Sequence, residues 1–162
     1  KKGSQDPFLM TVLNICVKEV YIKTFYNLVK TQEERTGCRM PTPVERYCVH
    51  LLAERVERAN IIPDPSFAEK YLRMFSNPNV TEIKTFADDC LFFTSLVPEY
   101  GTRRGLSIRY YADLGITSYH YCSDATNDYV FKQVGDCFYE LQKFLESTIK
   151  NRPITDLFNN NL

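Results

Sequence analysis

Apolar residues recur at steps of three and four positions along most of the chain, which is the spacing of one face of an α-helix. In residues 11–36, the apolar face is predicted to contain Val12, Ile15, Cys16, Tyr21, Ile22, Phe25, Tyr26 and Val29. Gly37 follows, and glycine adopts the left-handed conformation of a C-terminal cap at low cost. The sequence therefore predicts a first long helix that ends at Thr36.

The clearest local signal is the tetrapeptide TPVE at residues 42–45. It combines a capping hydroxyl, a proline at the first helical position and a glutamate at the spacing of a capping box. This signal predicts a second helix that continues to about Asn60. Two prolines in residues 61–66 then interrupt it. A second capping box, at residues 66–69, predicts a short helix that ends at Ser76.

Residues 80–97 are apolar on nearly every side of the helix that they are predicted to form. One side holds Ile83, Ala87, Cys90, Leu91, Thr94 and Val97, and the remainder holds Phe86, Phe92, Phe93 and Leu96. A helix of this kind is stable only when other helices surround it. We therefore expect this helix at the centre of the fold.

Two further amphipathic helices are predicted, one over residues 108–125 with Ser107 as its cap and one over residues 129–150. No alternating pattern typical of a β-strand appears. The predicted fold class is all-α, a single-domain bundle of five main helices with a central apolar helix. The polar stretch 1–9 is interpreted as vector-derived, the bundle is assigned to residues 10–150, and a flexible tail to residues 151–162.

Composition narrows the function classes. The 162 residues are 44% hydrophobic and 25% charged, as in a folded domain, with 20 basic and 20 acidic residues. Because there is no net field, neither nucleic acid nor a membrane surface is predicted as a partner. No apolar run is long enough to span a bilayer and no secretory signal is recognisable, so a cytoplasmic location is predicted.

Six cysteines are spaced widely and irregularly, at Cys16, Cys38, Cys48, Cys90, Cys122 and Cys137. Five of them fall in apolar helical patterns, where a free thiol behaves as a small hydrophobic residue. We therefore predict reduced cysteines in the core. His50 and His120 each have a cysteine two positions away, which lies on nearly the opposite side of a helix and forms no catalytic pair within it.

Other chemistry is equally sparse. The sequence contains no helical Glu-x-x-His pair, no HExxH, no paired zinc-binding cysteines and no glycine-rich phosphate loop. No metal, cofactor or catalytic residue is predicted, and an enzyme is not favoured.

The tyrosine-rich helix offers one candidate site. Ala112 and Gly115 share its apolar face, so a neighbouring helix can approach closely there. Around that contact lie Tyr110, Tyr111, Tyr119 and Tyr121. Buried tyrosines need a partner for the hydroxyl. The rings either complete the core, with their hydroxyls bonded at its margin, or line a ligand site.

Arg103 and Arg104 follow a helix that carries Asp88 and Asp89 in an apolar setting. Buried carboxylates need partners, and a guanidinium can bond both oxygens of one carboxylate. The four residues are therefore predicted to form a structural ion pair that ties the loop to the central helix. The alternative is that the two arginines bind an anion or an acidic partner.

Four segments of the chain resemble a small family of uncharacterised helical bacterial proteins. They are EERTGCRMPTPVERYCVHLLAE at residues 33–54, ADDCLFFTSLVPE at 87–99, RRGLSIRYYADLGITSYHYCSD at 103–124 and VFKQVGDCFYELQKFLE at 130–146. The chain departs from that family's pattern at Ser95 and in the length of the segment before the last helix. The resemblance implies a bacterial origin and a helical fold, and it implies no activity.

The main functional hypothesis is a non-enzymatic protein that binds another protein or its own copy. The chain has 14% aromatic residues and eleven tyrosines, and tyrosine is enriched at interfaces. On this hypothesis the partner-binding candidates are Arg103, Arg104, Tyr110, Tyr111, Tyr119 and His120. The alternative is a small-molecule-binding protein whose pocket is lined by Tyr111, Tyr119, His120 and Arg104. If the protein is exported to a host cell, its asparagine-rich tail is the segment that an export machinery could read.

Overall fold

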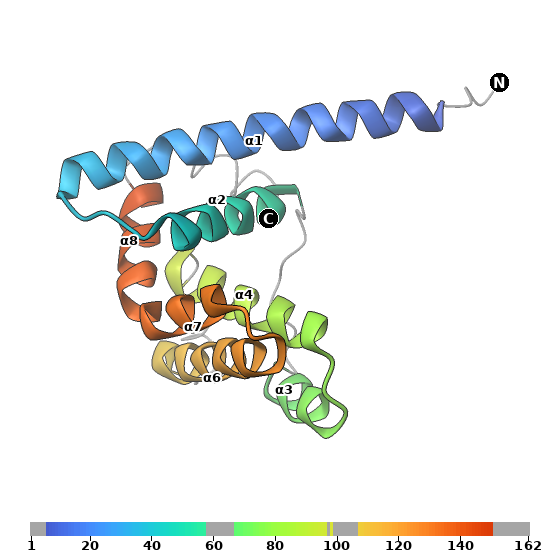
Figure 1. Ribbon diagram of the computed structural model, residues 1–162, viewed down its shortest axis with the longest axis vertical. Helices are drawn as coiled ribbons and strands as arrows, with labels where there is room; N and C mark the ends of the chain where they lie inside the picture. The colour runs from blue at the N-terminus through green and yellow to red at the C-terminus, as the bar shows by residue number, and fades with distance from the viewer. Residues whose placement is uncertain (1–5, 58–66, 97, 99–106, 151–162) are drawn as a thin grey trace. The chain divides into compact units, whose positions relative to one another are not determined.

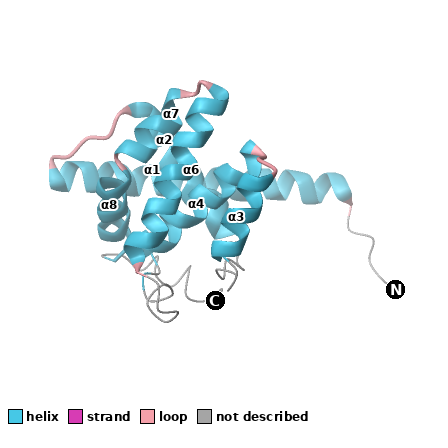
Figure 2. Cartoon of the chain, turned by 90° about the horizontal axis from the view of Figure 1, so that it is seen from below, coloured by secondary structure: helices cyan, strands magenta, loops and turns pink. Residues whose placement is uncertain are grey.

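The computed structural model describes residues 6–57, 67–96, 98 and 107–150 of the chain. These residues form seven helices and no strand (Figures 1 and 2). The helices are α1 Pro7–Thr36, α2 Thr42–Glu57, α3 Phe67–Ser76, α4 Val80–Leu96, α6 Ile108–Thr126, α7 Tyr129–Asp136 and α8 Phe138–Lys150. The all-α class is confirmed. The described helices belong to two compact units, α1 and α2 in the first and the other five in the second.

α1 begins at Pro7, four residues before its predicted start. The carboxylate of Asp6 accepts a hydrogen bond of 3.0 Å from the amide of Phe8, and Pro7 occupies the first turn. An aspartate followed by a proline is a favourable helix start, because one caps a free amide and the other has none to cap. The end is as predicted, since Gly37 has φ 68° and its amide donates to the carbonyl of Glu33.

Within the first unit, α2 packs against the C-terminal half of α1 (Figure 1). Phe25, Leu28 and Val29 are the buried apolar residues on this half of α1. The carboxylate of Glu45 bonds the Lys30 ammonium of α1, instead of closing the predicted capping box. The α2 start at Thr42 is therefore linked directly to α1.

α4 is the central helix of the second unit. It contacts α3, α6 and α8, and every residue from Phe86 to Ser95 is buried. The side chain of Asn79 caps its first turn by accepting from the amides of Thr81 and Glu82. The expectation of a surrounded apolar helix is met within this unit.

Two glycines allow helices to approach closely in the second unit. A Cβ added to Gly115 of α6 would lie 2.8 Å from both Cys90 Cβ and Phe138 Cε2, so the close approach predicted there is present. A Cβ on Gly135 of α7 would lie 2.8 Å from the ring of His120. A larger residue at position 115 would require a shift of α4 or α6 because Cys90 Cβ is fixed to its helix, whereas one at position 135 would require the His120 ring to move.

The helix predicted over residues 129–150 is two helices. α7 ends at Asp136 and α8 begins at Phe138, where the chain changes direction (Figure 1). Cys137, between them, leaves the helical conformation with φ −100° and ψ 16°. α8 is held to α4 by the Gln142 amide, which donates to the carbonyl of Thr94 at 2.8 Å.

The cysteines are less buried than predicted. All six are free thiols, but only Cys48, Cys90 and Cys122 are buried, while Cys137 is half-buried and Cys16 and Cys38 are exposed. Cys16 was placed on the apolar face of the first helix by its spacing. It is exposed because it lies before the segment of α1 that packs on α2 and on the side opposite to the buried Phe25 and Val29.

Candidate functional site

Tyr119, a predicted ligand-lining residue, is a core residue. Its ring is completely buried and its hydroxyl donates to Asp88 Oδ1 at 2.8 Å. The other oxygen of Asp88 accepts from Lys84 Nζ at 2.7 Å. α4 and α6 therefore supply a partner for each oxygen of this buried carboxylate, and the tyrosine hydroxyl is occupied in doing so.

Tyr111 and Tyr110 differ sharply although they are adjacent. Tyr111 is buried, and its ring meets Phe67 of α3 edge-on at 5.5 Å between centroids. Tyr110 is exposed and contacts Tyr111 edge-on at 5.7 Å. The interpretation of the rings as core residues thus describes Tyr111 and Tyr119, while Tyr110 presents its ring at the surface.

His120 faces α7 rather than the core. Its Nε2 lies 2.9 Å from Asp136 Oδ1, and the ring rests on Gly135. Asp136 also accepts from Lys132 Nζ at 2.5 Å. The hydrogen bond from Lys132 lowers the pKa of Asp136 most, and the hydrogen bond from His120 lowers it further. The cluster is an exposed clasp between α6 and α7.

In the described part of the chain, the predicted site residues therefore do not line one common pocket. Tyr119 bonds α4, His120 bonds α7, and Tyr110 is exposed. Arg103 and Arg104 lie outside the described residues, so their predicted pairing with Asp88 and Asp89 stays a prediction. Asp89 itself is buried on α4, as that prediction requires.

The buried thiols are poorly suited to nucleophilic or metal chemistry. Burial raises the pKa of Cys122 to about 11, and burial followed by the nearby Asp89 carboxylate raises that of Cys90. Both stay protonated at neutral pH, whereas the thiolate is the nucleophile and the metal ligand. Across the described ranges, no three His, Cys, Asp or Glu side chains are grouped to hold a metal ion.

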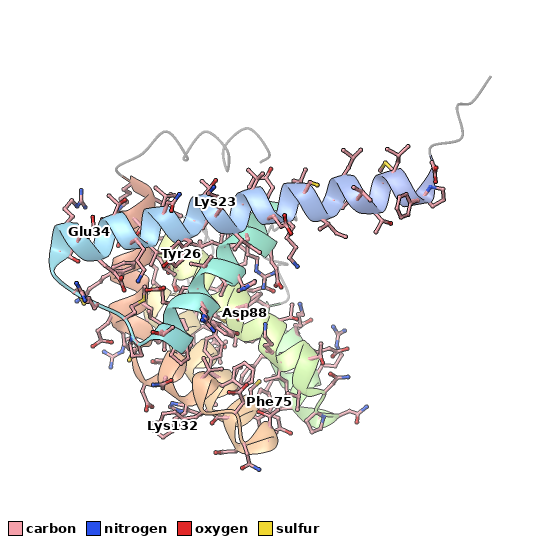
Figure 3. All side chains as sticks on the ribbon, turned by 45° about the horizontal axis from the view of Figure 1, so that its top comes forward. Lys23, Tyr26, Glu34, Phe75, Asp88 and Lys132 are labelled. Carbon is pink, nitrogen blue, oxygen red and sulfur yellow. The ribbon has the colours of Figure 1, made fainter. Side chains whose placement is uncertain are left out.

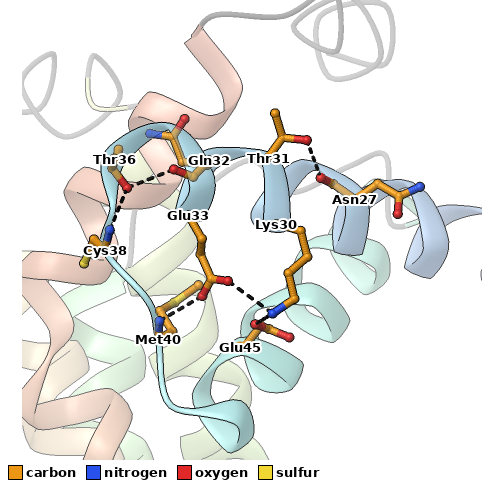
Figure 4. A network of polar contacts seen from close by, with 9 residues as sticks. All are labelled: Asn27, Lys30, Thr31, Gln32, Glu33, Thr36, Cys38, Met40 and Glu45. Carbon is orange, nitrogen blue, oxygen red and sulfur yellow. Dashed lines mark hydrogen bonds and ion pairs between the residues drawn. The ribbon is translucent and has the colours of Figure 1, made fainter.

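A second polar cluster fixes the turn between α1 and α2 (Figure 4). Lys30 bonds the buried carboxylates of Glu45 and Glu33, which raise the pKa of the lysine in that order. Glu33 also accepts from the amide of Met40 at 2.8 Å. Because all these groups are paired with one another, the cluster holds the first unit together and offers no open ligand position.

The most unusual surface is the N-terminal segment of α1, residues 7–20, which we call the arm. Eight of its apolar residues are exposed, namely Phe8 (74%), Leu9 (58%), Met10 (41%), Val12 (40%), Leu13 (55%), Ile15 (54%), Val17 (46%) and Val20 (63%). Their side chains project around much of the ribbon in Figure 3. A continuous exposed apolar surface of this size is typical of an interaction site.

Helix lengths explain why the arm is uncovered by α2. α1 has 30 residues and α2 has 16, a difference of 14, which equals the length of the arm. At about 1.5 Å per residue, α1 exceeds its partner by roughly 21 Å. Figure 1 shows α1 continuing past the end of α2.

The apolar face also rotates along α1. At about 100° per residue, Leu9, Cys16 and Val20 lie on the side opposite to the buried Phe25 and Val29. The polar residues Thr11, Asn14 and Lys18 instead continue the line of the buried side. The side of α1 that meets α2 would thus not cover the apolar side of the arm even if α2 were longer.

Sequence reasoning missed the arm, although a signal was present. No charged residue occurs between Asp6 and Lys18. Steps of three and four residues placed Val12 and Ile15 on one face with Phe25, but a wide apolar surface satisfies such steps in several directions.

The described helices contain none that is both long enough and apolar enough to cross a membrane.

No family model, curated protein or solved structure matches this chain. The resemblance to helical bacterial proteins is therefore still a prediction.

Proposed function

We propose that this is a non-enzymatic protein that acts by binding another protein chain through the arm of α1. The observation that carries the proposal is the exposure of eight apolar residues between Phe8 and Val20. Six of them lie at or after Met10, so the surface persists without the residues interpreted as vector-derived. The proposed bacterial cytoplasmic setting depends on the resemblance and on the composition.

The size of the surface supports a protein partner. Eight such side chains leave on the order of 100 Å² each, or about 800 Å² together, which is what one partner contributes to a standard interface. Covering half of it would contribute on the order of 10 kcal/mol before the costs of association are subtracted. A surface of this kind is therefore an adequate source of binding free energy.

The charge of the arm favours protein over membrane. Helices that lie on lipid surfaces carry Lys and Arg on the polar side. The polar side of the arm has Thr11, Asn14 and a single cation, Lys18. The balanced charge of the whole chain adds no attraction to anionic lipid.

A small-molecule ligand at the tyrosine-rich helix has less support. Tyr111 is buried against Phe67, and the Tyr119 hydroxyl is bonded to Asp88. Two of the four residues proposed to line that pocket thus have structural roles in the core.

A site-specific photocrosslinker tests the proposal. The full chain carries p-benzoylphenylalanine at position 13 on the arm or, as the matched control, at position 72, where Leu72 of α3 is 68% exposed. After irradiation in the native cell, we expect a crosslink to a polypeptide from position 13 and not from position 72. Absence of any protein crosslink from position 13, or equal crosslinking from both positions, contradicts the proposal.

A further inference from the structure

We infer that the partner of the arm is a second copy of this chain, paired antiparallel through Leu9, Leu13, Cys16 and Val20. The inference rests on the proposed function and names the partner, and it concerns the chain as given, in which Leu9 belongs to the stretch interpreted as vector-derived and forms part of α1. These four positions run along the middle of the apolar side of the arm, flanked by Val12 on one side and Val17 on the other.

The spacing of the four positions is self-complementary. They are separated by four, three and four residues, so the pattern is the same in both directions along the helix. In an antiparallel pair, Leu9 would face Val20 of the second copy and Leu13 would face its Cys16. A two-fold interface requires such a patch, because each copy presents the same residues to the other.

Helix length favours the antiparallel orientation. The stripe is centred midway between Asn14 and Ile15, at the middle of the arm's exposed length. A second arm running in the opposite direction would overlap residues 9–20 and place its own α2 beyond the far end. The two α1–α2 hairpins would then lie at opposite ends of the paired arms.

The parallel orientation is disfavoured by charge. Continuing the same stripe beyond Val20 reaches Lys23, an exposed residue of α1, and then Asn27. Parallel helices would bring Lys23 opposite its own copy, and like charges at such a position are destabilising. In the antiparallel register, Lys23 of each copy would instead face Asp6 of the other, so no like charges would meet along the extended stripe.

The area indicates a weak, concentration-dependent dimer. Two helices in contact cover about half of each circumference, so the pair would bury about 800 Å² in total, below the size of a standard interface. We therefore expect a dissociation constant in the micromolar range or above. The association would be missed in dilute solution.

Sedimentation equilibrium from about 1 to about 300 µM tests the dimer, a range chosen for an interface of this size. We expect the wild-type mass to rise towards that of a dimer. Leu13→Lys should weaken association at least tenfold, and Leu72→Lys, an equally exposed site on α3, should not. Because both positions are exposed, helicity measured by circular dichroism should be unchanged in either variant.

Disulfide trapping tests the orientation. Two preparations are made in a Cys16→Ser, Cys38→Ser background, one with Leu9→Cys and one with Val20→Cys. We expect oxidation to link the two chains in the mixture and neither preparation alone. Efficient links within each single preparation would establish parallel pairing and overturn the inferred orientation.

The two proposals fail separately. A wild-type chain that stays monomeric up to about 300 µM overturns the inference, and if position 13 still crosslinks to a different polypeptide in the cell, the proposed function stands. A monomeric chain whose position 13 crosslinks to no protein contradicts both.

Discussion

α4 and the arm of α1 are both helical segments with apolar residues on most sides, yet their surroundings are opposite. α4 is covered by α3, α6 and α8, and its residues from Phe86 to Ser95 are buried. The arm extends past α2 and exposes eight apolar residues. The comparison shows that a helix with apolar residues on most sides needs other surfaces to pack against it. Its own sequence does not indicate whether those surfaces belong to the same chain or to another.

The two segments also differ in how they carry charge. α4 holds Asp88 inside its unit and pairs it with Tyr119 and Lys84. The arm has no charged residue before Lys18. A charge inside a covered helix needs dedicated partners, and an uncharged surface can be covered by any complementary apolar surface.

The largest predicted effect compares the same substitution in both segments. Leu91→Ala on α4, where the leucine is completely buried, should lower the free energy of unfolding by about 2–5 kcal/mol because it leaves a cavity. Leu13→Ala on the arm should change it by less than about 0.5 kcal/mol in dilute solution. Urea denaturation at low micromolar concentration measures both. Equal losses would show that the arm is covered within its own chain.

A smaller effect is predicted for the partner of the α4 charge. Tyr119→Phe removes the hydroxyl that donates to Asp88, which should cost about 1–3 kcal/mol because a buried acceptor loses its donor. The matched control is Tyr110→Phe, which removes an exposed hydroxyl and should be neutral within about 0.5 kcal/mol. Equal denaturation midpoints for these two variants would mean that the bond does not stabilise the second unit.

Local signals in the sequence were sufficient for much of the fold. Gly37 and Ser107 cap helices as predicted, because caps depend on one or two residues. The central position of α4 followed from its composition, and the close approach at Gly115 followed from the small residue on an apolar face.

The misses share a different cause, which is competition between distant contacts. Glu45 fits a capping box, but the ammonium of Lys30 on α1 binds its carboxylate instead. The break at Cys137 has no proline to announce it and coincides with the clasp of His120 against Gly135 and Asp136. The exposure of the arm has two causes, the greater length of α1 than of α2 and the rotation of the apolar side away from the side that meets α2, and the steps of three and four residues indicate neither.

In the candidate site, the burial of two tyrosines could be predicted, but the orientation of His120 could not. Tyr111 and Tyr119 share a face with Gly115, so their burial was one of the two interpretations that the sequence allowed. His120 was predicted to line the same pocket as a polar group, but it lies about 100° around the helix from Tyr119, and its ring turns to α7. The predicted pocket therefore took its residues from two different sides of α6.

The smallest predicted effect concerns the exposed cluster of His120, Lys132 and Asp136 that joins α6 and α7. Bonds from Lys132 and His120 lower the pKa of Asp136, so the folded state favours its charged form. That stabilisation is present above the pKa of the unfolded chain, near pH 4, and is lost as the pH falls through the lower folded value. Asp136→Asn should therefore be less stable than wild type at pH 6, and the two urea midpoints should converge as the pH falls below about 4.

Asp124→Asn is the control, since this exposed α6 aspartate has no ion pair within the described residues. A wild-type advantage over Asp136→Asn that persists undiminished to pH 2 would show that the clasp acts through shape rather than charge.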